Sequence, residues 1–248
     1  MRNFKYYFLI VCLCNFSLYS QNKTGIVTYK QRLVSNKVFS SNSVKEGKVR
    51  ENIEMFNKVL KKNSNKFEYS LIFKDNKSYY KREISIEKDI DKFAIMLTGG
   101  DDEYYQDLLK KTKIKKLNAY GEEFNITSNL VDEEWTLINE TKKIESYICY
   151  KAMSFEIIKS RRGTFRKKIV AWYAPSLPYN FGPKGYGGLP GLILELNEGK
   201  IQYYVKKIIL NPSKRIEINK PSKGKLVTLE EFNEINRKMT KRWYKYKN

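Results

Sequence analysis

Residues 172–196 read WYAPSLPYNFGPKGYGGLPGLILEL, and this stretch decides the fold of the 248-residue chain. Ten consecutive positions, 182–191, hold five glycines and two prolines. Proline fixes φ and glycine adopts backbone conformations closed to other residues, so the segment predicts a connection with one defined path. It is not a phosphate-binding loop, because the Lys-Ser/Thr pair of such a loop is missing. It leads instead into an apolar strand, residues 192–194, which ends in Glu195.

On both sides of this loop the sequence predicts short β-strands. Residues with high β propensity recur in five segments separated mostly by short polar turns: 135–139, 147–158, 165–174, 192–196 and 201–210. Successive strands joined by tight turns favour antiparallel neighbours. The chain then ends in an expected amphipathic helix. Its start carries the capping box Thr228 and Glu231, and its apolar stripe consists of Leu229, Phe232, Ile235 and Met239.

The N-terminal half gives a weaker pattern. We expect a first strand at 25–33 and a hairpin of 67–73 with 78–81, because apolar residues alternate there around turn residues. The spacing of Val49, Ile53, Phe56 and Leu60 predicts a helix. Residues 84–118 are highly charged and weakly patterned, and Gly99–Asp102 among them predicts an exposed loop.

These elements predict one domain over residues 21–248, since the chain shows neither a repeat nor a linker. Its class is mainly β (α+β). We expect a single antiparallel β-rich domain, built as a curved sheet or a partly closed barrel, with a C-terminal amphipathic helix.

The loop and the strands before it carry motifs of a known family. Residues 188–193 read GLPGLI: Gly188, Leu189, Pro190, Gly191, Leu192 and Ile193. Upstream stand Trp135, the segment Tyr147–Ala152, the triplet Ala171–Tyr173, and the pairs Leu177-Pro178 and Gly182-Pro183. Over residues 130–200 the chain resembles the GLPGLI family of exported bacterial proteins, with Ser146 and Leu177 as small departures. The resemblance implies export and a β-rich domain with these six residues as a structural motif. It supplies no catalytic residues, because the function of the family is uncharacterised.

The first twenty residues predict a signal peptide. Arg2 and Lys5 precede a short apolar run, residues 6–14, and Ser20 is the expected cleavage position, with Ser17 as the alternative. A lipid anchor on Cys12 or Cys14 is a rival interpretation that lacks the small residues it needs. No later stretch is long and apolar enough to span a membrane. We therefore expect an exported protein, located in the periplasm, secreted or at the cell surface.

The composition excludes several classes of chemistry. The chain has no histidine, which removes Ser-His-Asp and Cys-His catalysis and His-ligated zinc. After cleavage of the signal peptide only Cys149 would remain among the cysteines, and its apolar surroundings predict a small buried side chain. We expect neither a metal nor a cofactor.

The chain is strongly basic, with a formal net charge of +21 that falls to +19 without Arg2 and Lys5. Only 10 of the 48 basic residues are arginine, and they are spread along the chain. This pattern favours a solvated surface, and no specific nucleic-acid partner is expected. Binding of an acidic polymer through net charge alone is an alternative.

The favoured hypothesis for function is a non-enzymatic binding or structural protein of the cell envelope, whose partner is an envelope protein, a peptide or a glycan. Its candidate binding residues are Trp172, Tyr173, Tyr179, Tyr186 and Glu195, although the same aromatic residues could instead close the core. The main alternative is a glycan hydrolase that uses paired carboxylates. It would combine Glu195 with Glu140 or with the pair Asp101 and Asp102.

Overall fold

The computed structural model describes residues 24–35, 47–84, 90–130, 134–160 and 163–245. The segment expected to be a signal peptide lies outside these residues. Within them, twelve strands form one sheet in the order β12-β6-β5-β4-β3-β2-β1-β11-β10-β9-β8-β7. None of the described helices has the length and apolar character needed to cross a membrane.

The strands of the N-terminal half are β1 (Thr24–Leu33), β2 (Glu68–Lys74), β3 (Lys77–Arg82), β4 (Glu103–Asp107), β5 (Thr112–Ala119) and β6 (Glu122–Asn129). Those of the C-terminal half are β7 (Thr136–Ile144), β8 (Tyr147–Ser160), β9 (Gly163–Ala174), β10 (Leu192–Glu198), β11 (Ile201–Leu210) and β12 (Lys225–Thr228). The α-helices are α2 (Lys48–Asn63), α3 (Lys92–Thr98) and α4 (Leu229–Lys245).

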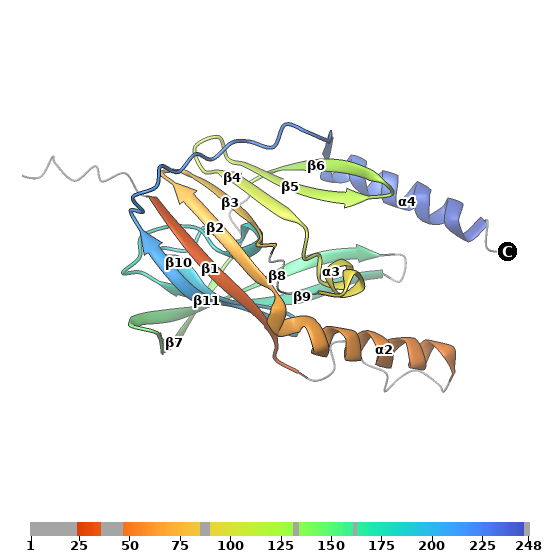
Figure 1. Ribbon diagram of the computed structural model, residues 1–248, viewed down its shortest axis with the longest axis horizontal. Coiled ribbons are helices and arrows are strands. Elements are labelled where there is room, and N and C mark those ends of the chain that lie inside the picture. The colour runs from red at the N-terminus through yellow and green to blue at the C-terminus, as the bar shows by residue number, and fades with distance from the viewer. Residues whose placement is uncertain (1–23, 36–46, 85–89, 131–133, 161–162, 246–248) are drawn as a thin grey trace, which may run out of the picture.

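Two antiparallel meanders make up most of the sheet. Strands β1 to β6 follow one another in space as in sequence, and so do β7 to β11. The two meanders meet where β1 pairs with β11, from Gly25 opposite Leu210 to Leu33 opposite Ile201. Figure 1 shows the two halves inclined towards each other like the walls of a trough. The strand joining them is therefore the first strand of the chain.

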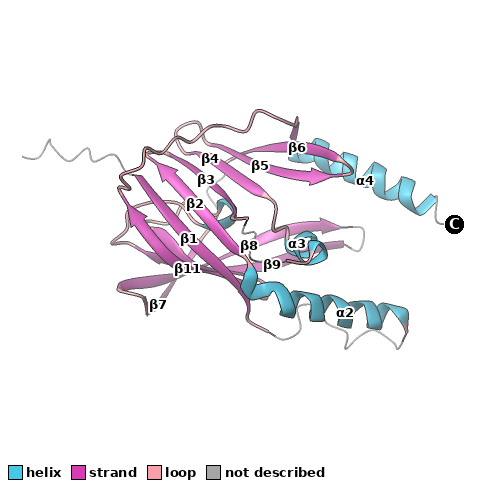
Figure 2. Cartoon of the chain, in the orientation of Figure 1, coloured by secondary structure: helices cyan, strands magenta, loops and turns pink. Residues whose placement is uncertain are grey.

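The expected fold class is confirmed: the domain is mainly β, with a curved sheet and a C-terminal helix (Figure 2). One pair departs from the antiparallel pattern, since β12 runs parallel to β6. Among the described strands, the edge strands β12 and β7 pair with only one neighbour each, so the sheet is open.

The inner face of the sheet holds the main core. Along β1 the buried side chains alternate with half-exposed ones, which places Val27, Tyr29 and Gln31 on the inner face. Their neighbours on β2, Tyr69 and Leu71, are also buried. This alternation is the pattern that predicted the first strand and the hairpin that follows it.

Both predicted helices are present. Helix α2 packs through Phe56 on Phe93 of α3, with ring centroids 5.1 Å apart, whereas Val49 of the expected apolar stripe is exposed. Helix α4 begins with the predicted capping box, in which the Thr228 amide donates to Glu231 and the Glu231 amide donates to the Thr228 hydroxyl. Phe232 of α4 packs on Phe124 of β6.

Residues 84–118 are more ordered than their sequence suggested. They contain α3, β4 and most of β5, and Gly100 of the expected exposed loop is buried beside Phe67. The sequence pattern is weak here because the lysines of β5 stand at half-buried positions, where apolar residues would be expected. They obscure the apolar alternation of the strand.

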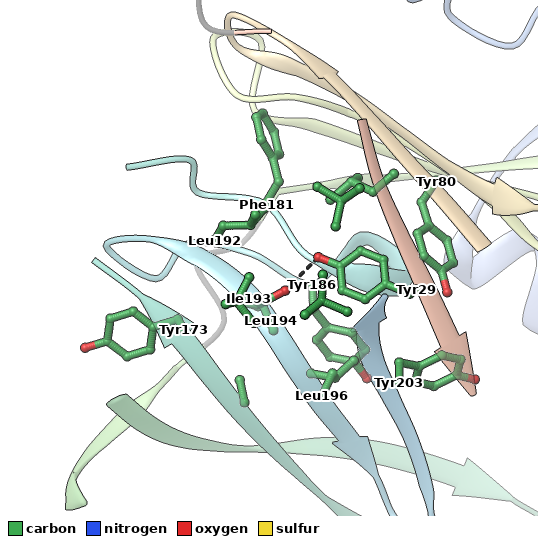
Figure 3. Close-up of a cluster of buried hydrophobic side chains, with 14 of the residues drawn as sticks. Tyr29, Tyr80, Tyr173, Phe181, Tyr186, Leu192, Ile193, Leu194, Leu196 and Tyr203 are labelled. Carbon is green, nitrogen blue, oxygen red and sulfur yellow. Dashed lines mark hydrogen bonds between the residues drawn. The ribbon is translucent and has the colours of Figure 1, made fainter. Parts of the chain in front are cut away.

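The Gly/Pro loop, residues 175–191, crosses the inner face instead of lying outside the sheet. Its side chains Leu177, Phe181 and Leu189 are buried in the core. At the exit of the loop the Tyr29 hydroxyl donates a 2.6 Å hydrogen bond to the Ile193 carbonyl (Figure 3). This bond lies beside a bulge between Ile193 and Glu195, where the pairing of β10 with β9 shifts register. The loop is therefore part of the core.

A substitution at Gly191 tests how closely the Gly/Pro loop packs in the core. A Cβ at that position would lie 2.3 Å from the Ala174 carbonyl oxygen, and two rigid backbones cannot separate easily. We expect Gly191→Ala to lower the free energy of unfolding by about 3 kcal/mol in urea titrations. The control is Gly121→Ala, where φ is 80° but the surrounding space is open. It should cost only about 1 kcal/mol, and equal losses in the two variants would contradict the packing argument.

Candidate functional site

A cleft of about 1360 Å³ opens on the inner face of the sheet. Strands β5 and β6 with the start of α4 form one wall, and β8 and β9 form the other. The side of the Gly/Pro loop that carries Lys184 and Tyr186 forms its floor. The lining residues used below are Asp102, Tyr104, Lys113, Lys115, Leu117, Ile126, Ser128, Trp135, Ser154, Glu156, Ile169, Lys167, Lys184, Tyr186, Glu198 and Phe232.

Four charged side chains alternate on the floor and one wall of this cleft. Lys184 contacts Glu198 at 2.5 Å, and Glu198 contacts Lys167 at 2.6 Å. Lys167 also contacts Glu156 at 2.5 Å, so one ammonium group joins two carboxylates. The backbone of Lys184 is held at φ 56° between Pro183 and Gly185 in a short 3-10 turn, and its side chain reaches Glu198 at the end of β10.

The two innermost charges stabilise each other. Burial alone would raise the pKa of Glu198, but the charges of Lys184 and Lys167 outweigh burial and hold that pKa at about 2. Burial would lower the pKa of Lys184, but the charge and hydrogen bond of the Glu198 carboxylate act against it, and this pKa lies above its ordinary value. Both side chains are therefore charged throughout the neutral range.

A layer of buried tyrosines lies behind these charges. Burial raises the pKa values of Tyr69, Tyr80, Tyr104 and Tyr203 well above 10, so their hydroxyl groups stay protonated. The ammonium group of Lys184 lies 5.5 Å from the ring centroid of Tyr203. Tyr203 thus contacts the buried ion pair, and Tyr69, Tyr80 and Tyr104 extend from it as a series of packed rings.

The rest of the cleft combines apolar surface with paired charges. Trp135 donates from Nε1 to the Gly187 carbonyl at 2.8 Å and meets the Tyr186 ring edge-on. On the opposite wall Lys115 contacts Asp102 at 2.7 Å. Most charged groups of the cleft are therefore neutralised within the protein itself.

The structure separates the candidate residues that the sequence singled out. Tyr186 lines the cleft, although it is buried, and Tyr173 faces the core. Tyr179 packs on Phe73 with ring centroids 4.5 Å apart. Trp172 and Glu195 lie together on the outer face, because they are paired in register and alternate with the inward-facing Glu198.

Glu195 is 7% exposed and contacts Lys142 Nζ at 2.6 Å. The same ammonium group lies 4.3 Å from the ring centroid of Trp172. The acids considered as its partners are held by other cations: Glu140 by Lys151, Asp101 by Arg82 and Asp102 by Lys115. The contacts of Glu195 thus give no support to a carboxylate pair built on this residue.

The Cys149 thiol is buried. Burial raises the pKa of the Cys149 thiol to about 11, so the reactive thiolate is scarce near neutral pH. In the part of the chain that the structure describes, no group of three or more Cys, Asp or Glu side chains is placed to hold a metal ion.

Sequence reasoning missed the charged residues of the cleft. Lys167, Lys184 and Glu198 come from a strand, a loop and a strand end, and nothing in their local sequence distinguishes them from the other charges of a basic chain. One usable signal was the position of Lys184 inside the Gly/Pro loop, where a rigid backbone predicts a fixed side chain.

Comparison with known proteins finds structures of similar fold and indicates no activity. A family described as a protein of unknown function (Porph_ging) matches residues 161–195, which include all of β9 and the Gly/Pro loop. This match is short, and the resemblance to the GLPGLI family stays a prediction. A search of functionally curated proteins finds no match.

Among solved structures, the chain is similar to PNGF-II in its C2 crystal form, with 13% identity and a TM-score of 0.50. A second crystal form of PNGF-II gives 15% identity and a TM-score of 0.49. Both similarities cover 86% of this chain but only 32% of that chain. Identity this low shows a shared fold alone, with a portion of PNGF-II about a third of its length.

The buried ion pair predicts a specific dependence on pH. The pKa of Glu198 is lower in the folded chain than its ordinary value of 4.5, so its stabilisation is present above pH 4.5 and is lost as the pH falls towards 2. We expect Glu198→Gln to reduce the free energy of unfolding by about 3 kcal/mol at pH 7. This difference should shrink between pH 4.5 and 2.5 in urea titrations.

The matched control is Glu156→Gln, because Glu156 contacts the same Lys167 but is largely exposed. It should cost less than about 1 kcal/mol at pH 7. A Glu198→Gln deficit that stays constant down to pH 2.5 would disprove the assigned role of the carboxylate.

Proposed function

We propose that this chain is an exported, non-enzymatic binding protein that holds an extended peptide segment in the cleft of its curved sheet. The cleft itself is the observation that carries the proposal. Its volume of about 1360 Å³ exceeds the roughly 300–1,000 Å³ of ordinary small-molecule sites. Export rests on the N-terminal pattern of Arg2, Lys5 and the apolar run after them.

The charges of the cleft favour binding over catalysis. A general acid must be protonated near the working pH, whereas Glu198 with a pKa of about 2 stays ionised. Glu156 and Glu198 both contact Lys167, so each carboxylate is engaged by a cation. These groups are well suited to fix the shape of the floor.

The surface of the cleft favours a peptide over a polyanion or a glycan. Ion pairs within the protein occupy Lys115, Lys167 and Lys184, which leaves less positive charge to attract an acidic polymer. Of the aromatic rings that line the cleft, Tyr104, Tyr186 and Phe232 are buried, and only Trp135 and Phe155 expose part of a ring for stacking on sugars. Apolar side chains of a peptide can contact Leu117, Ile126 and Ile169 instead.

The sheet edge beside the cleft supplies a second supporting observation. Trp135 and Thr136, at the start of β7, line the cleft, and among the described strands β7 pairs only with β8. The other side of β7 therefore offers backbone donors and acceptors to an added strand. Extended peptides bind in this way at exposed sheet edges, with side chains held in adjacent pockets.

Selection from a random peptide library on the mature chain tests this proposal. Ser128 lines the cleft on β6, so Ser128→Trp should obstruct it while leaving every existing contact of the floor in place. Asn129, the next residue, is exposed and points to the opposite face. We expect selected peptides to bind Ser128→Trp at least about tenfold more weakly and Asn129→Trp unchanged, as measured by fluorescence polarisation.

Two results would count against the proposal. One is that no peptide is enriched on the wild-type chain. The other is that enriched peptides bind Ser128→Trp as tightly as the wild type, which would place their site outside the cleft.

A further inference from the structure

The hairpin of β8 and β9 exposes apolar side chains on both of its faces near the turn. Ile158 and Phe165 form a cross-strand pair on the inner face and are 38% and 50% exposed. Phe155 and Ile157, on the outer face, are 41% and 52% exposed. An antiparallel strand pair with one face on the core and the other in solvent ordinarily carries polar residues on the solvent face. Contiguous exposed apolar side chains instead mark a surface that meets a partner.

Cations lie directly beside these apolar side chains. The guanidinium carbon of Arg166 lies 4.2 Å from the ring centroid of Phe155, and exposed Lys168 is paired in register with that residue. The whole chain carries a formal net charge of +21. The partner of this hairpin is therefore expected to combine apolar and anionic character.

The ends of two helices lie at the same end of the molecule as the β8–β9 hairpin. Figure 1 shows that the β8–β9 hairpin, the start of α2 and the end of α4 all extend towards one end of the long axis. Exposed Lys48 and Val49 begin α2, and exposed Lys238 and Lys241 lie in the second half of α4. This hairpin end, defined by Phe155–Ile158, Phe165–Lys168 and the two helix ends, thus joins exposed apolar residues with cations on separate elements.

We propose that the hairpin end docks on the surface of an anionic lipid bilayer. The apolar side chains of the hairpin would enter the boundary between headgroups and acyl chains, and the cations would contact the lipid phosphates. The two-sided exposure favours lipid over a folded protein, because a protein surface covers one face of a hairpin whereas an interface immerses both. Basic segments with apolar side chains bind anionic membranes by this combination of burial and charge.

The hairpin end adjoins the cleft, since Phe155, Ile157 and Arg166 also border it, but the two side chains chosen for substitution do not. Ile158 and Phe165 are not among the cleft-lining residues, so replacing them leaves the cleft intact. A failure of one proposal therefore carries no consequence for the other.

Vesicle co-sedimentation of the mature chain tests the proposal. The probes are vesicles of phosphatidylcholine alone and vesicles of equal parts phosphatidylcholine and phosphatidylglycerol. We expect binding to the mixed vesicles, weakened at about 0.5 M NaCl. The double variant Ile158→Ser with Phe165→Ser should bind about tenfold or more weakly. Leu109→Ser serves as the matched control, because Leu109 is 78% exposed in the turn between β4 and β5 and should leave binding unchanged.

Three outcomes would overturn the proposal. They are the absence of binding to mixed vesicles, an equal loss in the Leu109 control, and salt-sensitive binding that the double variant retains in full. The last result would show that net charge acts without the hairpin. Circular dichroism of each variant confirms that the fold is unchanged, as expected for substitutions at exposed positions.

Discussion

A curved, open sheet has a concave apolar face, and another segment of the chain must cover that face to remove it from water. This requirement shapes the other parts of the structure. The Gly/Pro loop covers part of the concave face, with Phe181 and Leu189 buried and the Ile193 carbonyl held by Tyr29. Such a path needs backbones in close approach, which explains the density of glycine and proline. The cleft lies on the same face, beside the loop.

The floor of the cleft shows how the fold tolerates charge near its core. Lys184 belongs to the loop and Glu198 to the strand that the loop precedes, so their ion pair joins the covering segment to the sheet. A buried pair of this kind adds little net stability compared with apolar residues, but it fixes the register of the parts it joins. Rigid tyrosine rings behind it leave few alternative arrangements.

The sequence predicted the strands and helices better than their arrangement. Strict alternation revealed β1, β2 and β3, and a capping box with an apolar stripe revealed α4, because these signals are local. Strand β4 escaped notice because it is only five residues long, and β5 because lysines interrupt its apolar alternation. The candidate site was largely missed: Trp172 and Glu195 proved to lie on the outer face, and of the candidate residues only Tyr186 and Asp102 line the cleft. Which strands become neighbours depends on contacts between distant segments, which no local pattern encodes.

The central place of β1 has a consequence for how the chain acquires its structure. Gly25 pairs with Leu210, so β1 cannot complete its pairing until β11, near the end of the chain, has been synthesised. A chain emerging N-terminus first can form the β1–β6 meander early, but one edge of β1 and its inward-facing Tyr29 stay uncovered until β11 is made. Unpaired edges and uncovered apolar faces promote aggregation. Assembly of this protein is therefore expected to be slow and to benefit from a chaperone that shields β1 until the second meander arrives.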